Sequence, residues 1–146
     1  MPISNILEKR IQYRIKKSKD FVFMLPDFLD LSDRDQIMRA LRKLITKGLI
    51  LKVGRGVYVK AKKSNLTGKI IPQTDLTEIG KEVAKKLNFK ILPTKYEQWY
   101  NEGKSTQVPN GKVIAINGTI LRKIGFNGVY ITYETVRNKA KYYKYN

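Results

Sequence analysis

One helix in this chain has both of its ends marked in the sequence. Ser32-Asp33 offers an N-cap, and Gln36 stands three residues after Asp33, which is the spacing of a capping box. Gly48 follows the last apolar position and suits a left-handed C-cap. Between these ends, apolar residues recur at the spacing of a buried helical face: Ile37, Leu41, Leu44 and Ile45. The pattern predicts a helix from about residue 33 to residue 48 with one face turned to a core.

A hairpin signal follows this helix directly. Two apolar segments, residues 49–53 and 57–60, flank Gly54-Arg55-Gly56, which is the arrangement of a strand, a tight turn and a second strand. Ahead of the capped helix, the four-residue recurrence of Ile3, Leu7, Ile11 and Ile15 predicts another amphipathic helix. Between them, residues 21–25 read as a short buried strand, and Pro26 after it fits the first turn of a brief helix.

The order of these elements predicts the fold class. Helix, brief helix, capped helix and hairpin within about sixty residues is the order of a winged helix-turn-helix, whose third helix enters the DNA major groove. The composition changes after residue 63, because the polar stretch up to Gln73 contains Gly and Pro and lacks a helical period. We therefore predict an α+β protein with a DNA-binding domain at residues 1–63 and a small α/β domain at residues 64–146.

The second half carries weaker signals. A helix is predicted from about Asp75, and strands are predicted near residues 89–93, 112–116, 119–124 and 129–133. Asn117-Gly118 predicts a type I′ turn that joins two of these strands into a hairpin. The aromatic segment with Tyr96, Trp99 and Tyr100 predicts a short helix, and core or domain packing explains it better than base stacking does.

Charge and composition narrow the function classes. The 146 residues include 30 Lys or Arg and 12 Asp or Glu, a net charge of +18, so a polyanion is the expected partner. Cysteine and histidine are absent, which argues against thiolate nucleophiles, disulfides and the common metal sites. We expect a cytoplasmic protein without a membrane segment, without cofactor, metal or catalytic residues, and either monomeric or homodimeric.

Nine residues are candidate DNA contacts. Arginine pairs with guanine and glutamine with adenine, so Arg34, Gln36 and Arg39 near the start of the capped helix are the predicted base-reading residues. The remaining candidates, which suit phosphate contacts, are Arg42, Lys43, Lys47, Lys52, Arg55 and Lys60. The alternative interpretations are a solvated charged helix face and an ordinary hairpin with an exposed arginine.

The chain also resembles a known family. The residues that carry the resemblance are Ile37, Ala40, Leu41, Lys43, Leu44, Lys47, Gly48, Ile50, Lys52, Gly54, Arg55, Gly56 and Tyr58. They are followed far downstream by Ser105-Thr-Gln-Val-Pro109, ahead of a predicted strand hairpin. Together these motifs are similar to those of the AbiEi-like antitoxins and small winged-helix transcriptional regulators of type IV toxin-antitoxin systems, over nearly the whole chain.

The resemblance implies a function. It implies an N-terminal winged helix-turn-helix that binds operator DNA and represses its own operon, with the reading helix at residues 34–47 and the wing at 52–58. It further implies a C-terminal domain that helps to antagonise a nucleotidyltransferase-like toxin. The expected function is therefore sequence-specific binding of double-stranded DNA by an antitoxin-like regulator. The alternative is a basic protein- or RNA-binding module that antagonises a toxin without operator-specific DNA binding, and an enzyme is not expected.

Overall fold

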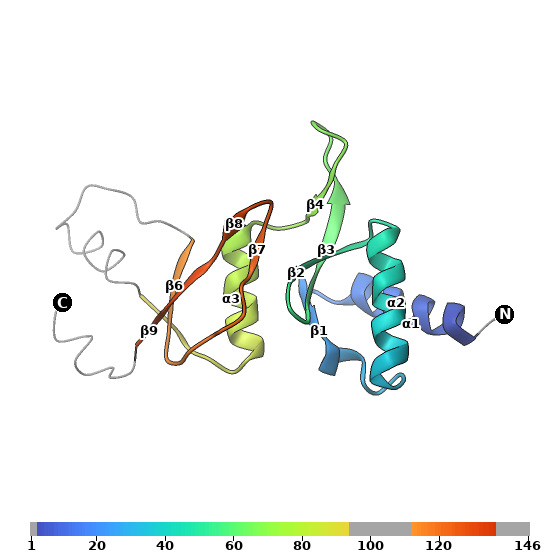
Figure 1. Cartoon of the computed structure of the whole chain (residues 1–146), viewed down its shortest axis with the longest axis horizontal. Coiled ribbons are helices and arrows are strands. Elements are labelled where there is room, and N and C mark those ends of the chain that lie inside the picture. The colour runs from blue at the N-terminus through green and yellow to red at the C-terminus, as the bar shows by residue number, and fades with distance from the viewer. Residues whose placement is uncertain (1–2, 94–111, 137–146) are drawn as a thin grey trace. The chain divides into compact units, whose positions relative to one another are not determined.

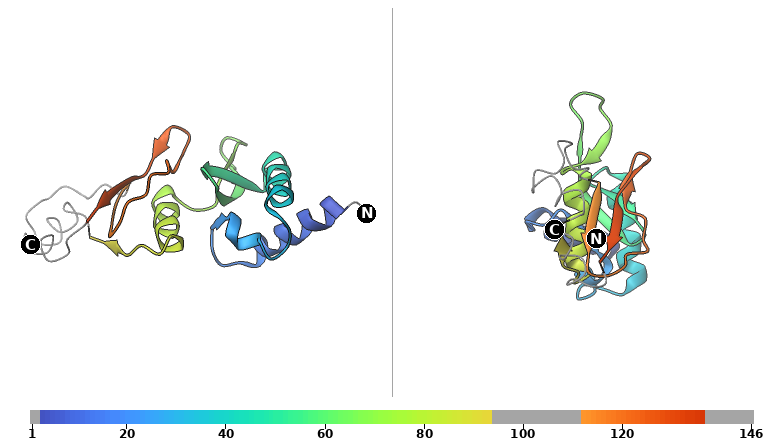
Figure 2. Two further views of the ribbon diagram at one scale, coloured as in Figure 1. Left: turned by 60° about the horizontal axis from the view of Figure 1, so that its bottom comes forward. Right: turned by 90° about the vertical axis from the view of Figure 1, so that its left-hand side faces the viewer.

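The computed structural model describes residues 3–93 and 112–136 (Figure 1; Figure 2). This part of the chain is an α+β fold with three α-helices and several small sheets. The chain divides into two compact units, Met1–Asp75 and Leu76–Asn146. The predicted aromatic helix at residues 94–100 and the motif at residues 105–109 lie outside the described residues.

The first unit contains two α-helices, a short 3-10 helix and four strands. In chain order these are α1 (Ile3–Lys17), β1 (Val22–Met24), η1 (Leu25–Phe28), α2 (Arg34–Thr46), β2 (Ile50–Gly54), β3 (Val57–Lys63) and β4 (Ile70–Pro72). The strands form one antiparallel sheet in the order β1-β3-β2, and β4 pairs with the end of β3.

The core of this unit lies between the two helices and the sheet. Each helix contributes residues of its predicted apolar stripe, and the sheet contributes side chains from β1, β2 and β3. The members of this core include Leu7, Ile11, Ile15, Ile37, Leu41, Leu44, Phe23, Ile50 and Tyr58. Burial of side chains of this size stabilises a fold by about 1.5–3 kcal/mol each, so this cluster fixes how α2 lies on the sheet.

An ion pair connects α1 to the segment that follows η1. The Arg14 guanidinium donates to both carboxylate oxygens of Asp30, at 2.6 and 2.8 Å, and to the Asp27 carbonyl at 2.8 Å. Hydrogen bonding to Asp30 raises the pKa of Arg14, and hydrogen bonding to Arg14 lowers the pKa of Asp30. The charge of Arg14 is thus compensated by Asp30 within the first unit.

Both predicted ends of α2 are confirmed. The Asp33 side chain accepts a hydrogen bond from the Gln36 backbone N–H at 2.9 Å, as an N-cap should. At the other end Gly48 has a φ of +76°, its N–H donates to the Ile45 carbonyl and the Leu49 N–H donates to the Leu44 carbonyl. These two bonds form a Schellman motif, which satisfies carbonyls that the end of a helix leaves unpaired.

The predicted domain boundary near residue 63 falls too early. Residues 64–73 are not a linker, because β4 pairs with β3 in a register that joins Lys63 to Ile70 and Ala61 to Pro72. The Gln73 side chain adds a hydrogen bond to the Ala61 carbonyl at 2.9 Å. This second hairpin therefore belongs to the first unit, which extends to Asp75.

The described part of the second unit contains one helix, a small mixed sheet and a short hairpin. Its elements are α3 (Leu76–Lys86), β5 (Ile91–Leu92), β6 (Val113–Ile116), β7 (Gly125–Phe126), β8 (Val129–Tyr130) and β9 (Thr132–Thr135). In the sheet, β6 pairs antiparallel with β5 and parallel with β9. The Tyr133 hydroxyl donates to the Gly80 carbonyl of α3 at 2.7 Å, and burial raises the pKa of Tyr133.

The predicted hairpin at Asn117-Gly118 is wrong, and no strand forms over residues 119–124. The Asn117 side chain instead accepts a hydrogen bond from the Lys90 N–H at 2.8 Å, and a Cβ at Gly118 would overlap the ring of Phe89. The type I′ turn forms at Asn127-Gly128, where both residues have positive φ, and it joins β7 to β8. Both positions carry the dipeptide Asn-Gly, and tertiary contacts decide which of the two makes the turn.

Candidate nucleic-acid interface

The outward side of α2 is rich in positive charge. Arg34, Arg39, Arg42 and Lys43 are all exposed on this helix, while its apolar residues are buried in the core. The separation follows from the helical period, because a stripe that is apolar on one side leaves the remaining positions to solvent. Gln36 is half-buried in the first turn of the helix. Four of the predicted contacts thus share one accessible element.

The hairpin of β2 and β3 presents two further cations. The strands are joined by Arg55 and Gly56 alone, because Gly54 pairs with Val57. Gly56 has a φ of +69°, a conformation that favours glycine, so the tight turn depends on this residue. Arg55 at the turn and Lys52 on β2 are both exposed.

Tyr58 connects the charged side of α2 to the hairpin. Its hydroxyl donates to the Met38 sulfur of α2 at 3.7 Å, and its Cα pairs with that of Lys52 on the adjacent strand. Directly paired residues of antiparallel strands project to the same face of a sheet. Burial raises the pKa of Tyr58, and the nearby charge of Arg42 opposes part of that rise. Arg42 and Lys52, from two different elements, therefore both lie near one buried tyrosine.

We use the name basic surface for Arg34, Arg39, Arg42, Lys43, Lys52 and Arg55. The Arg42 Nε donates to the Met38 carbonyl of its own helix at 3.4 Å. The side chains of the other five form no hydrogen bond or ion pair with any residue in the described ranges, 3–93 and 112–136. Their charges are therefore compensated only by solvent ions, which an anionic ligand can replace.

Lys47 has a different environment from the basic surface. Its ammonium group lies 2.5 Å from a carboxylate oxygen of Glu8 on α1, and only 4% of Glu8 is exposed. A buried carboxylate without a partner is costly, so Lys47 compensates a charge at the contact between the two helices. This predicted DNA contact has a structural role.

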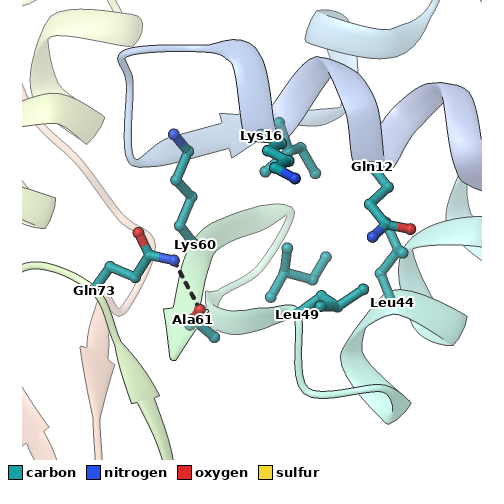
Figure 3. A pocket seen from close by; sticks show the side chains of 9 residues that line it. Gln12, Lys16, Leu44, Leu49, Lys60, Ala61 and Gln73 are labelled. Atoms are coloured by element: carbon teal, nitrogen blue, oxygen red, sulfur yellow. Dashed lines mark hydrogen bonds between the residues drawn. The ribbon is translucent and has the colours of Figure 1, made fainter. Parts of the chain in front are cut away.

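Lys60 also has a partner within the fold. Its ammonium group donates to the Ser18 carbonyl at 2.5 Å and lies 5.6 Å from the centre of the Phe21 ring. Figure 3 shows the side chain reaching toward the loop that follows α1, beside a small pocket that Gln12, Lys16 and Gln73 also line. Lys60 is thus turned to the α1 side of the unit, and it is not part of the basic surface.

Three exposed lysines near the hairpins were not among the predicted DNA contacts. Lys62, Lys63 and Lys69 are exposed around the second hairpin, and Lys69 lies in the polar stretch beyond the predicted domain boundary. A composition signal was present: from Gln36 to Thr74 the chain contains ten Lys or Arg residues and no Asp or Glu. Within residues 3–93 and 112–136 there is no cluster of acidic side chains that suits a metal ion.

Residues 8–143 match a protein family described as a family of unknown function (DUF6088). The chain belongs to DUF6088. No curated protein and no solved structure matches it. The match of this DUF6088 protein spans most of both units and includes every residue of the basic surface. None of the helices in its described residues combines the length and the apolar content needed to cross a membrane.

Proposed function

We propose that this protein is a sequence-specific double-stranded DNA-binding regulator of transcription, and that its first unit acts as a winged helix-turn-helix. The observation that carries the proposal is the basic surface: six exposed cations on α2 and the adjoining β2–β3 hairpin, connected through Tyr58. Such a surface suits a phosphate backbone, which supplies most of the affinity in protein–DNA complexes.

The arrangement of the first unit supports this assignment. The order α1, β1, η1, α2, β2, β3 and the sheet order β1-β3-β2 place a capped helix and a hairpin side by side on one core. A helix of this kind has the diameter of the DNA major groove, and the hairpin beside it suits a neighbouring phosphate or minor-groove contact. In this arrangement α2 is the reading helix and the Arg55 turn is the wing.

The residues divide into two roles. Arg34, Gln36 and Arg39 lie near the N-terminal end of α2, where a reading helix contacts base edges, and their side chains suit guanine and adenine. Lys43, Lys52 and Arg55 suit phosphates, because they surround the reading positions and are free to reach a backbone.

The proposal extends to an antitoxin role. The resemblance to AbiEi-like antitoxins supports repression of the protein's own operon and binding of a nucleotidyltransferase-like toxin through the second unit. Co-purification with the product of the neighbouring gene tests the toxin partner, and protection of DNA immediately upstream of its own gene tests the operator.

The decisive test is selection from a pool of random 30-bp duplexes, followed by binding measurements on the recovered sequence. We expect Arg39→Ala to lose about 1–3 kcal/mol of binding free energy at one cognate base pair, and to discriminate less against changes of that pair. Lys43→Ala is the matched control, because it removes a neighbouring exposed cation on α2 and should weaken binding to all duplexes alike.

Two results would count against the proposal. Unaltered sequence discrimination by Arg39→Ala would refute the base-reading role of α2. Tighter binding to a structured RNA than to the selected duplex, at the same salt concentration, would favour the alternative of an RNA-binding module. Because salt alone changes such affinities by orders of magnitude, both competitors must be measured in one buffer.

A further inference from the structure

The loop that joins β3 to β4 carries an exposed leucine. Leu66 is 97% exposed, although leucine is a residue that folding usually buries. The paired part of the hairpin ends at Lys63 and Ile70, so the six residues between them project beyond the sheet (Figure 1; Figure 2). Single exposed leucines are common, and the surroundings of this one decide what it can do.

Five hydrogen bonds hold the loop in shape. The Ser64 N–H donates to the Lys69 carbonyl and the Gly68 N–H donates to the Ser64 carbonyl, at 2.8 and 2.9 Å. The Ser64 hydroxyl accepts from the N–H groups of Leu66 and Thr67, and the Thr67 hydroxyl accepts from the N–H of Lys69. The leucine is therefore presented on a preorganised turn, which lowers the entropy cost of inserting it into a partner.

The surroundings of Leu66 are cationic. Lys62, Lys63 and Lys69 are exposed, and none of them forms a side-chain hydrogen bond or ion pair with the described part of the chain. An apolar tip between lysines matches a partner that is anionic outside and apolar inside. Duplex DNA has this character, because phosphates flank its stacked bases. One leucine buries too little apolar area to hold a protein at a lipid surface.

The position of the loop relative to the Arg55 turn suits the same partner. The two loops lie at opposite ends of β3, and seven residues of strand from Val57 to Lys63 separate them by about 20 Å. Half a helical turn of B-DNA is about 17 Å. A duplex that contacts the Arg55 turn at one groove therefore brings a neighbouring groove within reach of the second hairpin.

We propose that the β3–β4 hairpin is a second DNA-binding arm, which inserts Leu66 between base pairs from the minor groove and bends the duplex. This inference rests on the proposed function and adds to it a separate contact with its own consequence. Lys62, Lys63 and Lys69 hold the flanking phosphates, and the leucine partly unstacks one base step. Proteins that insert apolar side chains in this way kink DNA by about 20–90°.

The test measures bending by energy transfer between dyes at the two ends of the selected 30-bp duplex. We expect the wild-type protein to bend this duplex by at least about 20°. Leu66→Ala should lose at least half of the bend, while its Kd changes by less than about tenfold because the lysine contacts remain. Leu121→Ala is the matched control, since Leu121 is 92% exposed in the second unit and should leave the bend unchanged.

A second variant tests the lysines. Replacing Lys62, Lys63 and Lys69 together by alanine should reduce the salt dependence of binding. The magnitude of the slope of log K against log salt should fall by about one per lysine. If the Leu66→Ala variant bends the selected duplex as much as the wild-type protein does and binds it with the same affinity, the inference is overturned and the proposed function stays intact. Failure of the wild-type protein to bind any duplex would overturn both.

Discussion

Lys43 and Lys47 show how two lysines only four residues apart acquire different environments. Both were predicted DNA contacts, and both lie at the C-terminal end of α2 or directly after it. Lys43 is exposed without a side-chain partner in the described ranges, whereas Lys47 compensates the buried carboxylate of Glu8. The helical period cannot separate them, because the difference depends on a residue of another helix.

We therefore expect Lys47→Ala to affect stability. Without its partner the Glu8 carboxylate stays buried and uncompensated, so the free energy of unfolding should fall by about 1–3 kcal/mol in urea denaturation. Lys43→Ala should stay within about 0.5 kcal/mol of wild type. Adding Glu8→Gln to Lys47→Ala should recover part of the loss, and equal stabilities of the two lysine variants would show that the ion pair contributes nothing.

At the scale of elements, the C-terminal end of α2 sets where the first hairpin begins. The Schellman motif at Gly48 reverses the chain so that Leu49 and Ile50 lead directly into β2. Gly48 also lies against Ile70 of β4, because a Cβ built on it would be 3.0 Å from the Ile70 Cδ1 atom. One glycine thus serves the helix end and the packing of the second hairpin.

Gly48→Ala should lower the free energy of unfolding by about 1–2 kcal/mol, because alanine is strained at a φ of +76°. Thermal or urea denaturation measures the loss. The same substitution in an Ile70→Val background removes the Cδ1 contact and leaves the strain of the backbone. A smaller loss in that background would assign the difference to packing against β4, and no loss in either would refute the role of the left-handed cap.

At the scale of the whole molecule, net charge and charge placement make separate predictions. Residues 1–75 contain 17 Lys or Arg and seven Asp or Glu, and the second unit is basic as well. An interaction governed by total charge would be insensitive to which cations are removed. The proposed interface requires that cations of the basic surface matter more than exposed cations elsewhere.

Two double variants of equal charge separate these possibilities. Lys43→Ala with Lys52→Ala removes two members of the basic surface, and Lys85→Ala with Lys90→Ala removes two exposed lysines of the second unit. Each cation that neutralises a phosphate adds about 0.9 to the magnitude of the slope of log K against log salt. The first pair should reduce its magnitude by about two, and the second pair should not change it. Equal slopes for the two variants would contradict the proposed interface.

Local interactions explain which features could be predicted from the sequence. Caps, turns and apolar periodicity act between residues a few positions apart, so the ends of α2, its buried stripe and the β2–β3 hairpin follow from the order of residues alone. The excess of basic residues is likewise a property of composition. Together these determined the α+β class. They also determined seven of the nine predicted contacts, which remain accessible on α2 and the hairpin without an ion-pair partner: Arg34, Gln36, Arg39, Arg42, Lys43, Lys52 and Arg55.

Long-range contacts decided the rest. Pairing of β4 with β3 turned an apparent linker into a hairpin, and packing of Phe89 on Gly118 moved the type I′ turn from Asn117-Gly118 to Asn127-Gly128. The roles of Lys47 and Lys60 likewise depend on α1 and on the loop after it. Residues distant in sequence meet only after the chain has folded, so the partner of a charge and the register of a strand are properties of the tertiary structure.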